Sequence, residues 1–110
     1  LGLLYVREKT YNKALEYLKK ATELAPENSR FNYVYGIALY SRQKSQDALD
    51  VLKSALSFHP YDRELLYALA TMNRDLGKFE DALEYTLRLI ELYPQDQSFR
   101  QLEQLLRSRL

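Results

Sequence analysis

The sequence predicts an all-α fold, a right-handed α-solenoid of antiparallel helix pairs, and three observations carry this prediction. Pro26, Pro60 and Pro94 follow one another at a spacing of 34 residues, so the chain repeats. Apolar residues such as Ala48 and Leu52 recur at intervals of three and four, which is the period of a helix face. The 110 residues contain only three Gly and three Pro, too few for the turns of a β-rich fold.

Small residues keep the same register as the prolines. The step of 34 residues links Gly2, Gly36 and Ala70, and it links Ala14, Ala48 and Ala82. The distance between two packed helices depends on the side chains at their contact, so small residues on both allow a close approach. We therefore expect the two helices of each pair to nest at these positions.

Helix ends can be placed from the same columns. Proline lacks the backbone N–H and clashes with the preceding turn, so each proline ends a helix. Asn28, Asp62 and Asp96 follow two residues later, and their side chains are suited to cap the next helix. Polar turns at 8–10, 43–45 and 77–78 separate the helices of a pair. The expected helices are 1–8, 11–25, 29–42, 45–58, 63–76, 79–92 and 97–109.

One domain, 1–110, accommodates all of these elements. It divides into a truncated first repeat (1–28), a second (29–62), a third (63–96) and a capping helix (97–110). The first repeat lacks most of its first helix and the chain does not begin with Met, so we expect a fragment of a longer protein. Leu1, Leu4 and Tyr5 are then partly uncovered. Further repeats before them, or self-association through this truncated N-terminal face, would cover them.

The spacing of small residue, alanine and proline resembles the tetratricopeptide repeat, and residues 76–83 (LGKFEDAL) are very similar to the turn and second helix of that motif. The resemblance covers 1–96, and 97–109 is similar to the helix that closes such arrays. It implies that the first helix of each pair lines a concave surface. Thr86 and Leu89 depart from the motif, since they reverse its usual order of a large and then a small residue.

A second stripe on the first helices predicts where a partner lies. At roughly 100° per residue, it is about 130° away from the core columns, so burial within a helix pair does not require it. Its members are Arg30, Tyr33, Ile37 and Tyr40 in the second repeat, and Glu64, Tyr67, Thr71 and Arg74 in the third. Tyrosine buries a large area at low entropy cost and keeps a polar tip, so this stripe predicts a peptide-binding groove.

The predicted function is therefore a non-catalytic protein–protein interaction module, whose partner is a protein or peptide segment with apolar or aromatic anchors. Two alternatives remain: the rings only fill space between first helices, or the segment is a structural spacer or self-association module. Some family members hold a peptide's terminal carboxylate with Lys, Asn and Arg. Tyr33, Ile37 and Ala68 occupy those positions, with Glu64 nearby, so capture of chaperone C-termini is not expected.

Composition argues against other functions. The absence of Cys rules out thiol catalysis, disulfides and thiolate metal sites. His59 is the only His and precedes a proline, so it suits a structural role, and no enzyme, cofactor or metal is expected. The net charge of +1 gives no field for nucleic acid. No apolar run approaches the roughly 18 residues of a membrane span, so no membrane insertion is expected.

A further resemblance concerns the compartment. Residues 59–66 (HPYDRELL), with 73–75 (NRD), are similar to repeat tails attached to some bacterial multihaem cytochrome-like proteins, which are exported. This chain has no Cys for haem attachment, so it would be only the protein-binding tail. The resemblance implies the bacterial periplasm, with the cytoplasm as the alternative.

Overall fold

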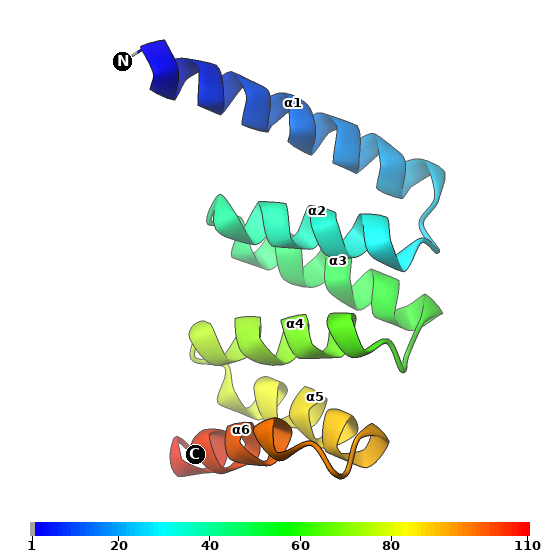
Figure 1. The fold of residues 1–110 in the computed structure, drawn as a ribbon, viewed down its shortest axis with the longest axis vertical. Helices are drawn as coiled ribbons and strands as arrows, with labels where there is room; N and C mark the ends of the chain where they lie inside the picture. The colour runs from blue at the N-terminus through cyan, green and yellow to red at the C-terminus, as the bar shows by residue number, and fades with distance from the viewer. Residues whose placement is uncertain (1) are drawn as a thin grey trace.

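The computed structural model describes the backbone of residues 2–110 and the side chains from Lys9 onward. Its helices are α1 (Gly2–Leu24), α2 (Ser29–Ser41), α3 (Ser45–Phe58), α4 (Arg63–Asp75), α5 (Phe79–Leu92) and α6 (Gln97–Ser108). They stack in chain order along the longest of the 45 × 32 × 21 Å extents (Figure 1). The all-α helical repeat fold is confirmed, and the helices from residue 29 onward lie within one residue of their expected bounds.

The helix pairs nest at the small residues. Ala48, Ala70 and Ala82 have no exposed surface. A Cβ atom added to Gly36 would lie 2.8 Å from Cδ2 and 2.9 Å from Cγ of Leu52, so α2 and α3 approach too closely for any side chain at residue 36. The predicted nesting of these two pairs is confirmed.

Caps and turns start and stop the helices as the repeat columns indicate. The side chains of Asn28, Asp62 and Asp96 accept hydrogen bonds from backbone N–H groups in the first turns of α2, α4 and α6. Between the helices of a pair, Gln43 and Gly77 take positive φ angles of 64° and 77°. These two residues occupy the same position in consecutive repeats, so each turn depends on one left-handed residue.

The first repeat departs from the prediction. Helices 1–8 and 11–25 with a turn at 8–10 are wrong, because α1 is one continuous helix of 23 residues. Lys9 occupies the position of Gln43 and Gly77, and a positive φ is unfavourable for a residue with a long side chain. No Gly or Pro lies between residues 3 and 25 to interrupt the helix. Leu1 and the side chains of Leu4 and Tyr5 lie outside the described residues, so their predicted exposure stays a prediction.

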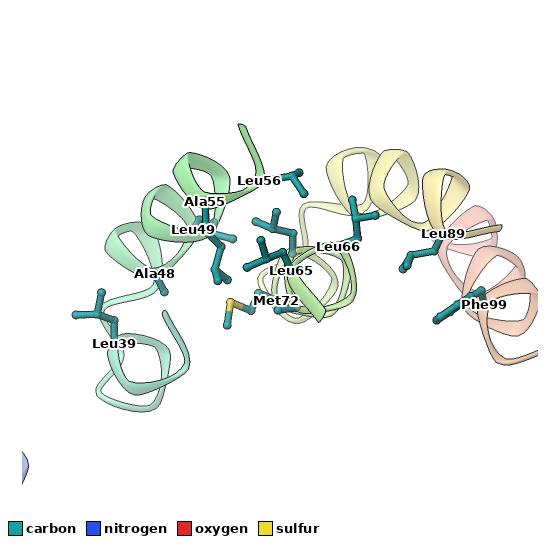
Figure 2. Packing of buried hydrophobic residues seen from close by; sticks show 13 residues of the cluster. Leu39, Ala48, Leu49, Ala55, Leu56, Leu65, Leu66, Met72, Leu89 and Phe99 are labelled. Atoms are coloured by element: carbon teal, nitrogen blue, oxygen red, sulfur yellow. The ribbon is translucent and has the colours of Figure 1, made fainter. Parts of the chain in front are cut away.

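The core lies between the two layers of helices (Figure 2). Leu49, Leu65, Leu66 and Leu89 contribute fully buried side chains to it, and Phe99 of α6 closes it at 2% exposure. Three buried polar side chains bond to backbone carbonyls: Asn32 Nδ2 donates to Pro26 and Asn28, Asn73 Nδ2 to Leu69, and Thr86 Oγ1 to Ala82. The polar substitutions in these core columns are therefore satisfied locally.

Candidate protein-binding groove

The N-terminal halves of α2, α4 and α6 form one side of the array and enclose a shallow depression, here called the Tyr hollow. Its volume is about 430 Å³, and it is lined by Tyr33, Arg63, Glu64, Tyr67, Ser98 and Phe99. A second depression of about 280 Å³ adjoins it between α2 and α4, and is lined by Ser29, Arg30, Tyr33, Asp62, Arg63 and Glu64. Together they make a groove that runs across consecutive first helices.

Aromatic rings supply the apolar surface of the Tyr hollow. Phe99 is almost fully buried and lies beneath Tyr67, with their ring centroids 6.0 Å apart. Tyr67 is 47% exposed, whereas Tyr33 is half-buried and packs partly against the core. The hollow therefore presents one accessible ring supported from below and a second ring at its edge. This arrangement is suited to receive an apolar or aromatic side chain.

Ion pairs bridge the first helices along the rim. Arg30 Nη1 donates to Glu64 Oε2 at 3.0 Å, and Arg63 Nη2 donates to Asp96 Oδ2 at 3.0 Å. The Arg63 guanidinium also lies 5.3 Å from the ring centroid of Phe99. Exposed pairs of this kind contribute little to stability, but they neutralise the rim and orient its polar groups. The rim is thus polar and charge-balanced around a ring-lined floor.

The structure brings only half of the predicted groove residues together. Arg30, Tyr33, Glu64 and Tyr67 line the two adjoining depressions. Ile37 is 40% exposed but lines neither of them.

The other predicted residues lie toward the C-terminal ends of α2 and α4. Tyr40 Oη donates to Asp75 Oδ2 at 3.3 Å, and Arg74 Nε donates to Asp75 Oδ1 at 3.1 Å. Burial, and then the charge and hydrogen bond of Asp75, raise the pKa of Tyr40. The hydroxyl of Thr71 donates to the Tyr67 carbonyl at 2.9 Å. These residues therefore link neighbouring helices outside the Tyr hollow.

Sequence reasoning does not identify Arg63, Ser98 and Phe99 as groove residues. Phe99 shares its repeat position with Leu65, a core residue, and periodicity therefore marks it as core. It is core and groove floor at once, because Tyr67 covers only part of the space above it. Arg63 directly follows the cap residue Asp62, where no apolar pattern singles it out.

The cap of α6 gives a prediction on pH. The Ser98 side chain, its backbone N–H and the Arg63 charge lower the pKa of Asp96, against a smaller opposing contribution from desolvation. A lowered native pKa means that ionised Asp96 stabilises the fold at neutral pH, and that this stabilisation is lost as the pH falls through the lowered value. Asp96→Ala is expected to lower the thermal midpoint at pH 7 and to approach the parent chain at acid pH. Equal midpoints at pH 7 would contradict this.

Signals for other chemistry are weak in the part of the chain that the structure describes. His59 Nε2 contacts the backbone carbonyl of Glu27, and so links the end of α3 to the loop before α2. No group of three potential metal ligands gathers among the described residues. Within the same residues, the helices are too short or too polar to cross a bilayer.

Comparisons with known proteins agree with this architecture. Two family models described as tetratricopeptide repeat match residues 1–63 and 64–96. A comparison with curated proteins gives no match. Among solved structures, the Arabidopsis OM64 TPR domain superposes with a TM-score of 0.77 at 19% identity, over 99% of this chain and 90% of that one.

Structures of the MamA protein are also similar. One crystal structure gives a TM-score of 0.81 at 25% identity, over 99% of this chain and 60% of that one. A MamA mutant gives 0.67 at 32% identity, over 84% of this chain and 54% of that one. The chain thus spans little more than half the length of these MamA chains. With its repeat columns, nested pairs and matching family models, the chain belongs to the tetratricopeptide repeat family of protein–protein interaction modules.

Proposed function

We propose that the Tyr hollow binds a protein or peptide segment by receiving one apolar or aromatic anchor side chain, and that the chain acts by binding, without catalysis. The observation that carries this proposal is the ring of Tyr67, which stays 47% exposed above buried Phe99 in the hollow. Aromatic residues are enriched at protein interfaces, and a ring supported by a rigid floor loses little freedom when a ligand covers it.

The rim supports the same proposal. Arg30, Glu64 and Arg63 surround the rings with donors and acceptors that a peptide backbone or polar side chain can use. A polar rim around an apolar centre is the usual anatomy of a protein interface. We expect micromolar affinity for a single short peptide, because ordering a flexible ligand opposes binding.

Tyr67→Ala is expected to weaken binding at least about tenfold, because the ring is the exposed anchor surface. The probe is a peptide selected from a phage-displayed library on the 110-residue chain and titrated by calorimetry. The thermal midpoint should change little, since the ring is half in solvent already. Tyr33→Ala is expected to weaken binding as well, with a larger loss of stability because its ring contacts the core.

Tyr61→Ala is the matched control, because Tyr61 is 73% exposed and lines a separate depression with Pro60 and Leu92. It is expected to leave the affinity unchanged. Peptides that bind Tyr67→Ala and the parent chain equally well would show that the hollow is not the binding surface.

A second candidate function, self-association, is favoured by a separate observation. Ala14 of α1 is exposed although its counterparts in α3 and α5 are buried. This observation does not involve the Tyr hollow, and its consequences are argued next.

A further inference from the structure

The apolar stripe of α1 lacks the partner helix that covers the same stripe in the other repeats. Ala48 and Ala82, the counterparts of Ala14, are 0% exposed, whereas Ala14 is exposed. Leu52, the counterpart of Leu18, is also 0% exposed, whereas Leu18 is half-buried. In α3 and α5 the preceding helix folds back over these positions. In α1 no turn forms, and the stripe is left open.

The straight course of α1 explains why the stripe is open. Gln43 and Gly77 reverse the chain with positive φ angles, but Lys9, at the same repeat position, lies inside the helix. The N-terminal half of α1 consequently runs outward past the end of α2 (Figure 1). The segment that would cover the stripe is therefore present in the chain but displaced from it.

The repeat register identifies what fits on the open stripe. In the second repeat Gly36 packs against Leu52, and the midpoint of this antiparallel pair is residue 44. One repeat of 34 residues earlier, the corresponding residues are Gly2 and Leu18, with their midpoint at residue 10. Two straight α1 helices paired antiparallel about a two-fold axis at residue 10 bring Gly2 of each copy to Leu18 of the other. The nested packing of α2 and α3 is then reproduced twice.

We propose that the open stripe of α1 binds a second copy of this chain, through an antiparallel pair of α1 helices. Each copy contributes the segment that its own missing turn fails to fold back, which is the exchange that makes swapped dimers accessible at low cost. The interface is isologous, so it closes at two chains.

The opposite end of the array does not offer an equivalent surface. α6 buries Phe99, Leu102 and Leu106 against α4 and α5. Its outer residues include exposed Gln97, Arg100, Gln101, Gln104, Arg107 and Ser108. A polar outer face is what terminates a repeat array in water. Head-to-tail stacking on α6 would leave these groups buried, so the α1 stripe is matched by another α1 stripe.

Sedimentation equilibrium of the 110-residue chain tests the proposal. The expected mass is twice the 13.0 kDa of one chain in the micromolar range. Lys9→Gly is expected to weaken dimerisation at least about tenfold, because glycine disfavours the straight helix and permits the positive φ of the turn. Lys9→Ala, which keeps a good helix former, is the matched control and should remain dimeric. A single-chain mass at every concentration would overturn the proposal, as would equal dimerisation of both variants.

A disulfide test separates exchange from folding back within one chain. The chain has no Cys, so Gly2→Cys with Leu18→Cys introduces the only two thiols. Oxidation is expected to give a covalent dimer on a non-reducing gel, since each thiol faces its counterpart on the other copy. A disulfide formed only within single chains would show that the segment folds back instead. Tyr67→Ala should leave the dimer intact, so the fate of this proposal is independent of the Tyr hollow.

Discussion

Gly36→Leu is expected to lower the free energy of unfolding by about 1–3 kcal/mol or more, the range measured for overpacked cores. Even a Cβ at residue 36 would lie 2.8 Å from Leu52 Cδ2, and Leu52 has no exposed surface into which to move. The two helices must then separate, and the array that holds the groove loosens with them. Urea denaturation followed by circular dichroism measures the change.

Ser54→Leu is the matched control, because Ser54 is an exposed residue in the middle of α3. A leucine added there meets solvent, and the unfolding free energy should stay within about 0.5 kcal/mol of the parent value. If Gly36→Leu and Ser54→Leu had similar effects, α2 and α3 would not be in the close contact described.

Phe99→Ala is expected to cost about 3–5 kcal/mol, the usual loss for a large aromatic removed from a core. Phe99 is 2% exposed and touches Tyr67 and Tyr93, so it fastens α6 to the rest of the array. The same change removes the floor of the Tyr hollow. Chemical denaturation gives the loss of stability, and amide hydrogen exchange is expected to show α6 opening first.

Phe58→Ala is the control for this second change. Phe58 ends α3 and is 51% exposed, so the same truncation there removes little buried surface. A loss at Phe58 as large as the loss at Phe99 would mean that α6 is not held by the Phe99 contacts.

Residues that recur at a fixed spacing allow much of this fold to be predicted from the sequence. The prolines, the cap residues and the small residues each have one local physical role, and these roles place α2 to α6 within one residue. Thr86, which departs from the family pattern, also has a physical reason. Its repeat position is that of Leu52, and it faces the position of Ala70 where Leu52 faces Gly36. A larger residue on one helix is offset by a smaller one on the other.

The rest depends on information that periodicity does not contain. The turn at Lys9 fails because a single residue must adopt a positive φ, and repeat columns do not report backbone angles. The groove floor is missed because Phe99 is core by pattern and only the packing of α4 against α6 brings it beneath Tyr67. The predicted stripe is correct in direction, but its eight residues divide between the Tyr hollow and the cluster at Asp75.

The nesting of paired helices at small residues is tested most directly by a double-mutant cycle between Gly36 and Leu52. Gly36→Ala alone crowds Leu52, and Leu52→Thr alone leaves a void, but the two together recreate the Ala70 and Thr86 combination of the third repeat. We predict that the double variant is more stable than the sum of the single changes by about 0.5–3 kcal/mol. Additive effects within about 0.3–0.5 kcal/mol would contradict direct packing between these residues.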